Sequence, residues 1–143
     1  MEELNKLEVD GVRTPKLYFY HDSLKQRSLG METIEGASLS QIVTGHAEIA
    51  NIHDISVDDF HSSMKNYIEA MHDHKIFHGD LFERNVMIEG ASLKPRVIDF
   101  GKSKMGYFDS DIGKYREGDF EVLKRVKQSL EQYLRGEKVD LNR

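Results

Sequence analysis

Two aspartates and an asparagine stand in one stretch of the chain, residues 78–101, with the sequence HGDLFERNVMIEGASLKPRVIDFG. Asp80 and Asn85 precede one apolar run, and Asp99 follows a second. Gly90 opens a turn between the two runs, so we expect the stretch to fold back as a β-hairpin. The hairpin would bring Asp99 near Asp80 and Asn85, and three oxygen-bearing side chains together suit a hard cation such as Mg²⁺. Because Asp, Asn and Gly also favour turns, a purely structural role is the alternative.

The order and spacing of these residues resemble the catalytic core of the protein-kinase-like superfamily. Residues 78–81 match the catalytic-loop pattern H-x-D-L, Asn85 stands where that pattern has its Asn, and residues 99–101 match D-F-G. The resemblance implies that Asp80 accepts or orients the proton of an acceptor hydroxyl. It also implies that Asn85 and Asp99 bind Mg²⁺ that bridges the phosphates of ATP.

Two positions depart from the usual kinase pattern. Gly79 replaces the Arg that is common in kinases switched by activation-loop phosphorylation, so that form of control is not expected. Phe82 occupies the place where many serine/threonine kinases have Lys. Arg84 stands where tyrosine kinases often have Arg, and the resemblance implies a catalytic contact with the γ-phosphate. The alternative is that Arg84 is a solvated surface residue.

Composition narrows the class of protein. The chain has 143 residues, of which 31% are charged and 38% hydrophobic, and these values suit one globular domain with a core. Its net charge of −5 gives no general attraction to nucleic acid or to an anionic membrane, so neither partner is expected. The absence of cysteine excludes disulfides and thiolate metal sites. No apolar run approaches the roughly 20 residues of a membrane span, and the acidic N-terminal stretch lacks a signal-peptide profile, so we expect a cytoplasmic location.

The segment before the motif predicts a helix end and two strands. Residues 2–7 have a helical pattern, and Asp10-Gly11 would close that helix. Aromatic and β-branched residues then predict strands at 14–20 and 28–34. A short helix is expected to begin at Ser38.

This arrangement resembles the second half of a kinase N-terminal lobe, in the style of small atypical kinases. Those include RIO-like kinases, the kinase subunit of the KEOPS complex and aminoglycoside phosphotransferases. On that resemblance Met31 takes the gatekeeper position, while the C=O of Glu32 and the N–H of Ile34 meet the adenine edge of ATP. The alternative is an ordinary edge hairpin with Met31 in the core.

Two long helices are predicted on either side of the motif. The first covers 56–74, where Ser56 and Asp59 form a capping-box pattern. Its apolar stripe, more typical of a core than of a binding surface, comprises Val57, Phe60, Met64, Tyr67, Ile68 and Met71. His72 and His74, near its end, are predicted to be structural.

The second helix is predicted at 119–134 and can end at Gly136. Its apolar face comprises Phe120, Leu123, Val126, Leu130, Tyr133 and Leu134. In the kinase-like family an aspartate near the start of the equivalent helix holds the catalytic-loop backbone, and Asp119 is the best match. The alternative is that Asp119 is a plain helix N-cap.

The predicted fold is α+β, a protein-kinase-like fold with mainly the helical C-lobe, a catalytic hairpin and a partial N-lobe sheet. Residues 1–36 are predicted to be a remnant of the N-lobe with the hinge, and residues 37–143 a compact C-lobe. The 143 residues contain no G-x-G-x-x-G loop and no matching strand lysine. We therefore expect a fragment of a longer kinase, a partner chain that supplies the missing segment, or a degenerate protein.

The predicted function is ATP- and Mg²⁺-dependent phosphotransfer to a hydroxyl, by an atypical serine/threonine protein kinase. One alternative is a small-molecule kinase of the aminoglycoside phosphotransferase type, which shares H-G-D and the Asn. Another is a catalytically dead pseudokinase that acts as a binding module. Retention of Asp80, Asn85 and Asp99 together argues against the pseudokinase, because a scaffold needs none of them.

Overall fold

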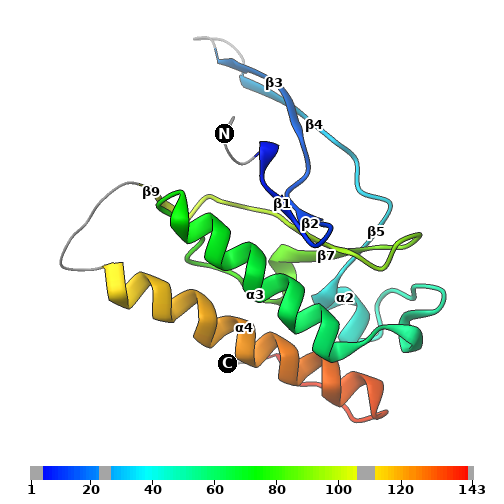
Figure 1. Cartoon of the computed structure of the whole chain (residues 1–143). Coiled ribbons are helices and arrows are strands. Elements are labelled where there is room, and N and C mark those ends of the chain that lie inside the picture. The colour runs from blue at the N-terminus through cyan, green and yellow to red at the C-terminus, as the bar shows by residue number, and fades with distance from the viewer. Residues whose placement is uncertain (1–4, 23–26, 106–111, 142–143) are drawn as a thin grey trace.

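The chain adopts a mixed α+β fold, which confirms the predicted class (Figure 1). The computed structural model describes residues 5–22, 27–105 and 112–141, without the side chains of 17–22, 27–31 and 105. Five strands form one sheet, two pairs of strands form smaller sheets, and two long helices, α3 (Val57–Asp73) and α4 (Ile112–Leu134), pack side by side. Within this described part no helix is long and apolar enough to cross a membrane.

The five-stranded sheet has the order β1-β2-β8-β7-β5. Its strands are β1 (Glu8–Val9), β2 (Val12–Arg13), β5 (Gly36–Ser38), β7 (Val86–Glu89) and β8 (Pro95–Val97). The pair β7–β8 is the predicted hairpin, with Val86 opposite Val97 and Ile88 opposite Pro95. It lies in the middle of the sheet, because β5 pairs with β7 on one side and β2 pairs with β8 on the other.

The N-terminal segment differs from the prediction. Residues 5–6 are helical, but Leu7 is not, and Asp10-Gly11 forms the turn between β1 and β2 instead of capping a helix. Both turn residues have positive φ, 52° and 81°, as a two-residue hairpin turn requires. The turn is fixed by buried Arg96 on β8, whose Nη1 donates to the Gly11 carbonyl at 2.7 Å and whose Nη2 donates to Glu89 at 3.1 Å.

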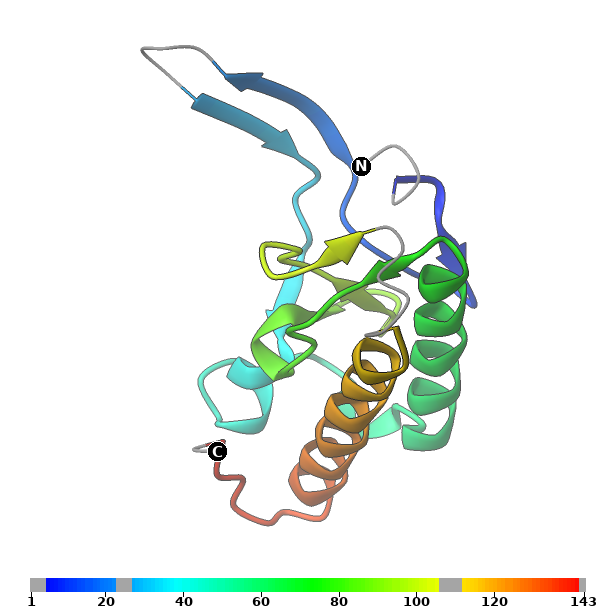
Figure 2. The ribbon, with the colours of Figure 1, turned by 90° about the vertical axis from the view of Figure 1, so that its left-hand side faces the viewer.

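The strands predicted at 14–20 and 28–34 are present with shifted ends. They are β3 (Leu17–Asp22) and β4 (Arg27–Met31), and they form a separate antiparallel pair that projects away from the larger sheet (Figure 2). Pro15 lacks a backbone donor, which explains the later start of β3. The strand does not extend to Ile34, because the chain leaves β4 there to join the other sheet, where the Glu35 carbonyl accepts from Gly90 at 2.9 Å.

The three helices predicted from Ser38 onward form. The short helix α2 (Leu39–Val43) has Ser38 as N-cap, with a full capping box to Gln41. Helix α3 has Ser56 as N-cap, and its hydroxyl accepts from the Asp59 N–H at 3.2 Å. Two short 3₁₀ turns, η1 (Ile52–Asp54) and η2 (Glu83–Asn85), precede α3 and β7 respectively.

Helix α4 begins at Ile112, seven residues before the predicted start at Asp119. The sequence pattern did not predict this first part of the helix, because Gly113 and Gly118 are poor helix formers and the apolar stripe starts only at Phe120. Tertiary packing supports it, since the ring of Tyr115 lies 6.0 Å from that of Phe77. The helix ends as predicted, with Gly136 at a φ of 77°.

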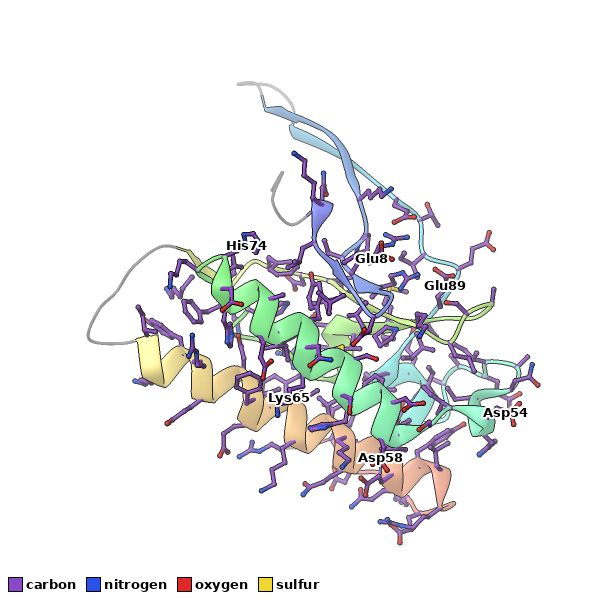
Figure 3. The ribbon with its side chains drawn as sticks, viewed as in Figure 1. Glu8, Asp54, Asp58, Lys65, His74 and Glu89 are labelled. Atoms are coloured by element: carbon purple, nitrogen blue, oxygen red, sulfur yellow. The ribbon has the colours of Figure 1, made fainter. Side chains whose placement is uncertain are left out.

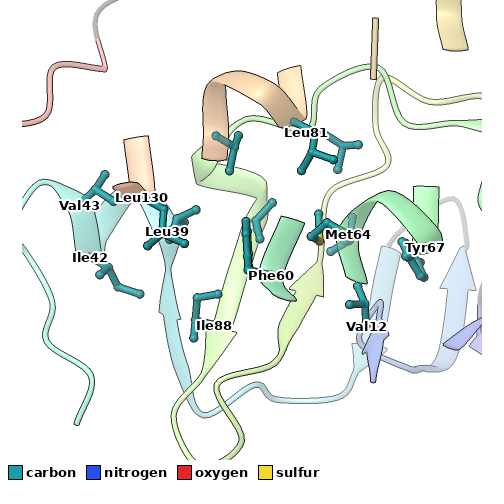
Figure 4. Packing of buried hydrophobic residues seen from close by; sticks show 14 of the residues in the cluster. Val12, Leu39, Ile42, Val43, Phe60, Met64, Tyr67, Leu81, Ile88 and Leu130 are labelled. Carbon is teal, nitrogen blue, oxygen red and sulfur yellow. The ribbon is translucent and has the colours of Figure 1, made fainter. Parts of the chain in front are cut away.

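One core fills the space between the sheet, α2, α3 and α4 (Figure 4). From α3, Phe60, Met64, Tyr67, Ile68 and Met71 are buried, so the predicted stripe is core. Leu123, Val126 and Leu130 meet them from α4, and Val86, Ile88 and Val97 from the central hairpin. The hairpin that carries the candidate site therefore rests directly on the main core.

A pair of glycine substitutions tests this packing. A Cβ at Gly36 would lie 1.9 Å from the Ile88 carbonyl oxygen, whereas one at Gly118 would meet nothing within 4 Å. We expect Gly36→Ala to lower the free energy of unfolding by about 2 kcal/mol, because backbone must move. Gly118→Ala should instead raise it by about 0.5–1 kcal/mol, through helix propensity. Urea denaturation measures both, and equal stability of the two variants would contradict the pairing of β5 with β7.

Candidate active site

The catalytic-loop segment is reached through a tight reversal at the end of α3. His74 caps the helix, and Lys75 adopts a φ of 60° before β6 (Ile76–Phe77). This short strand is buried and pairs with β9 (Lys104–Met105), with Phe77 opposite Lys104. The reversal therefore places His78 to Leu81 between the end of α3 and the segment that follows D-F-G.

Asp119 holds this loop from α4. Its carboxylate is only 2% exposed. Oδ2 accepts from the His78 N–H at 3.0 Å, and Oδ1 accepts from the Gly79 N–H at 3.0 Å. Asp119 lies inside α4, not at its N-cap, so the interpretation as a holder of the catalytic-loop backbone is the one that the geometry supports.

A third donor to the same carboxylate comes from α3. Nε2 of His72 lies 2.8 Å from Oδ2 of Asp119, and His72 is 1% exposed. Its Nδ1 is buried and has no partner among the described residues. The ring also packs on Phe77 at 4.8 Å and edge-on against Phe120 at 5.4 Å. His72 is thus structural, as predicted, and joins α3 to α4 and the loop.

Gly79 occupies a position that only glycine fits well. Its φ is +82°, and a Cβ there would lie 2.7 Å from the carbonyl oxygen of Lys102. Any larger residue would therefore combine backbone strain with a steric clash against backbone. The local packing explains why this position lacks the arginine of the usual kinase pattern.

His78 connects the catalytic loop to the end of the hairpin. Its Nδ1 accepts from the Asp80 N–H at 3.1 Å, and its Nε2 donates to the Ile98 carbonyl at 2.8 Å. The ring of Phe100 lies 4.6 Å away. Burial lowers the pKa of the imidazole below its ordinary value of 6.5. A neutral ring is also what these two hydrogen bonds require, because one nitrogen accepts and the other donates.

Asp80 is almost buried, at 7% exposed, and both of its carboxylate oxygens receive donors. Arg84 Nη2 lies 2.5 Å from Oδ1, and Asn85 Nδ2 lies 3.0 Å from Oδ2. The same amide group of Asn85 donates to the Asp80 backbone carbonyl at 2.7 Å. Arg84 itself is 57% exposed and stacks over the ring of Phe82 at 5.1 Å, so it is more than a solvated surface residue.

The hairpin brings Asp99 next to this group. The Ile98 N–H donates to the Asn85 carbonyl at 2.9 Å, which ties the residue before Asp99 to Asn85. Asp99 is exposed, adopts a φ of 57°, and accepts from the Gly101 N–H through Oδ1 at 3.1 Å. The predicted approach of Asp99 to the catalytic loop is therefore present in the fold.

These residues fit a magnesium site of the kind completed by a ligand. The NH₂ of Asn85 points at Asp80, so its amide oxygen faces the other way, and Asp99 is open to solvent. No group of three or more His, Cys, Asp or Glu suitable for a metal occurs among the described residues. Mg²⁺ commonly needs just one or two protein carboxylates when substrate phosphates supply further oxygens. The donor set thus suits a metal that arrives with a nucleotide.

The expected adenine contacts lie at the junction between the β3–β4 pair and the five-stranded sheet. Met31 ends β4, and its side chain is outside the described residues. The N–H of Glu32 donates to the Lys16 carbonyl at 2.8 Å, and Ile34 follows, half-buried. The roles of all three residues stay predictions.

The carboxylate of Glu32 makes an ion pair that the sequence did not indicate. It receives both terminal nitrogens of Arg13, with Nη2 at 2.8 Å from Oε2. Hydrogen bonding to Arg13 lowers the pKa of Glu32, and the pair joins β2 to the end of β4. The sequence did not predict this pair, because 19 residues separate the two partners and no local pattern relates them.

Comparisons with known proteins agree with the geometry. Residues 7–116 match the sequence profile of a family described as "Protein kinase domain". The chain is 30% identical over 72% of its length to "Serine/threonine-protein kinase C" of Synechocystis sp., covering 19% of that protein. It is 25% identical over 88% of its length to "EKC/KEOPS complex subunit bud32" of Dictyostelium discoideum, covering 47% of it.

A further relative is a "Probable bifunctional tRNA threonylcarbamoyladenosine biosynthesis protein" of Methanobrevibacter smithii. The identity is 30% over 90% of this chain, which covers 20% of that protein. The chain therefore spans less than half the length of each of these three relatives.

Removal of the Asp119 carboxylate tests its structural role. We expect Asp119→Ala to lower the free energy of unfolding by on the order of 3 kcal/mol, because two backbone N–H groups and His72 lose their acceptor. Asp58→Ala is the matched control, since that side chain is 93% exposed at the start of α3 (Figure 3). It should stay within about 0.5 kcal/mol of the parent. Similar losses in both variants, measured by urea denaturation, would contradict the buried anchor.

His78 predicts a pH dependence of stability. In the unfolded chain an imidazole titrates near pH 6.5, whereas burial lowers the pKa of folded His78 below that value. The unfolded state therefore binds the proton first as pH falls. We expect this contribution to be fully present above about pH 6.5 and to be lost as pH falls from there toward the folded pKa. ¹H–¹⁵N spectra at pH 6 should show His78 as the neutral Nε2–H tautomer, and a protonated ring in the folded protein would refute this.

Proposed function

The chain belongs to the protein kinase domain family, and we propose that it transfers the γ-phosphoryl group of ATP to a protein serine or threonine hydroxyl, as an atypical kinase. The observation that carries the proposal is the buried Asp80 carboxylate, held by Arg84 and Asn85 beside the exposed Asp99. The name of the relative "Serine/threonine-protein kinase C" supports the acceptor class. A cytoplasmic setting forms part of this proposal.

The proposal gives the two aspartates different roles. Asp80 has donors on both oxygens, so it is oriented firmly and suited to accept or direct a proton from an acceptor hydroxyl. Asp99 is exposed and bonded through one oxygen to Gly101, so its other oxygen suits a cation. Asn85 is shared between them, with its NH₂ on Asp80 and its oxygen as a neutral metal ligand. Mg²⁺ bound there would neutralise phosphate charge during transfer.

Arg84 supplies the positive charge closest to Asp80. Its guanidinium pairs with Asp80 and lies over the Phe82 ring, while most of the side chain faces solvent. We assign Arg84 to the γ-phosphate, whose transfer spreads negative charge over the moving group. To meet that group, the exposed guanidinium would exchange its contact with Asp80 for one with phosphate.

The nucleotide base belongs at the junction between β4 and β5. We assign the Met31 position to the back of the base site, and the Glu32 C=O and Ile34 N–H to the adenine edge. The Glu32 carboxylate is engaged by Arg13, which fixes the backbone at this point. The proposal divides the chain into residues 1–36, which contribute the hinge side, and residues 37–143, which contribute the catalytic side.

Substitutions at the two aspartates should separate binding from transfer. Asp99→Ala should abolish the Mg²⁺-dependent thermal shift induced by ATP, because its oxygen ligand is lost. Asp80→Asn should keep that shift but lower phosphotransfer by about 10²–10⁴-fold, the usual effect of losing a positioned acid–base group. Asp54→Asn, at an exposed position away from the loop (Figure 3), is the control and should match the parent in both assays.

The assays also define what defeats the proposal. Radiolabel transfer from ATP to protein and to small-molecule acceptors is measured with the parent and with each variant. A parent that shows no ATP-induced shift, or a shift unchanged in Asp99→Ala, would refute the nucleotide site. Transfer at the parental rate by Asp80→Asn would remove Asp80 from the mechanism.

A further inference from the structure

A pocket of about 420 Å³ lies beside the catalytic loop and combines apolar walls with positive charge. Its apolar lining comes from Phe77, Phe82, Tyr115 and Val122. Three lysines also line it, Lys102, Lys104 and Lys114, and all three are exposed. Among the described lining residues the acidic one is Asp119, whose buried carboxylate already accepts three hydrogen bonds.

The lysines come from two segments that the fold holds against the loop. The Lys102 carbonyl packs directly over Gly79, the residue before Asp80. Lys104 lies on β9 opposite Phe77, and Lys114 lies in the first turn of α4. The pocket is therefore next to the residue proposed to receive the acceptor proton, and Gly79 belongs to its lining.

Among the described residues, none of the three lysines forms an ion pair. In contrast, Lys127 on α4 and Arg135, just after α4, both do. The chain as a whole carries a net charge of −5, so the positive cluster runs against the general charge of the molecule. Three like charges around one pocket repel each other, and an anionic occupant would relieve that repulsion.

We propose that this pocket binds the acceptor as an acidic polypeptide segment. An apolar side chain of the segment would enter the pocket, and neighbouring carboxylates would meet the three lysines. The inference rests on the proposed function and adds to it the chemical class of the substrate. A peptide fits better than nucleic acid, because the lining is largely aromatic and aliphatic and the rest of the chain is acidic.

Peptide binding, measured without nucleotide, tests the acidic substrate class independently of catalysis. The probe is a fluorescent peptide with one serine, one leucine and four glutamates, compared with a matched peptide in which glutamine replaces each glutamate. We expect the acidic peptide to bind at least tenfold more tightly than its matched peptide, and to weaken as salt rises. Fluorescence anisotropy with the full chain measures both affinities.

Two charge-reversal variants test whether the acidic peptide binds at the pocket. The double variant K104E/K114E should weaken the acidic peptide by on the order of tenfold, since two exposed ion pairs become repulsions. K124E reverses one exposed lysine of α4 that does not line the pocket, and should stay within about twofold of the parent. Equal affinity for the two peptides, or equal loss in K104E/K114E and K124E, would overturn the proposal. Tighter lysine-dependent binding of a single-stranded RNA oligonucleotide than of the acidic peptide would also overturn it.

Phosphotransfer assays then distinguish the proposed acceptor pocket from the proposed kinase function. In an active chain, K104E/K114E should raise KM for the acidic peptide by the same factor as its dissociation constant, with kcat largely unchanged. A fall in kcat at constant KM would count against a role in acceptor binding. If the parent binds the acidic peptide through these lysines but transfers no phosphate to any acceptor, the proposed function fails while the docking site stands.

Discussion

The buried carboxylate of Asp119 accepts hydrogen bonds from three donors, and the rest of the site depends on them. His72 comes from the end of α3, the His78 and Gly79 N–H groups come from the catalytic loop, and Asp119 itself lies in α4. Taking two backbone N–H groups and an imidazole N–H out of water is unfavourable unless each finds an acceptor. One carboxylate meets that need for three elements at once, so the loop cannot shift without exposing buried donors. This arrangement fixes the backbone that carries Asp80.

Asp119 holds the loop backbone from the side of α4, while other groups of the loop bond to the end of the hairpin. His78 bonds forward to Ile98, and Asn85 bonds to the same residue through its carbonyl, so the hairpin end is joined to the loop at two points. Asp99 follows immediately and remains exposed. The two aspartates therefore lie close together but differ in environment. Asp80 is enclosed by donors and suits proton chemistry, while Asp99 is open and suits a cation.

The sequence predicted most of this framework, and the reasons for its failures are specific. The hairpin and the helix α3 were predictable because each follows from local patterning, and the motif supplied the order of Asp80, Asn85 and Asp99. Local patterning failed at Asp10-Gly11, where a turn-forming pair suits a helix end or a hairpin equally, and the strand β1 is only two residues long. It failed again at the start of α4, where contact with Phe77 outweighs two glycines.

Long-range polar pairs were beyond prediction for a different reason. Arg13 with Glu32 and Glu83 with Ser129, whose hydroxyl donates at 2.7 Å, join residues that no local pattern relates. Asp119 was the exception because the resemblance to kinases pointed to it. Even there the sequence left two interpretations open, which the position of Asp119 inside α4 and its hydrogen bonds to the catalytic loop separate.

Gly79 shows how a departure from a family pattern can follow from packing. Its backbone has a φ of +82° and the Lys102 carbonyl lies where a Cβ would be, so an arginine there would force the two segments apart. The same close approach joins the loop to the segment that carries Lys102 and Lys104. A ligand in the pocket that displaced this segment would also displace the backbone next to Asp80, because no side chain separates the two. The glycine in place of the arginine is therefore what allows the lysine-bearing segment to lie against the catalytic loop.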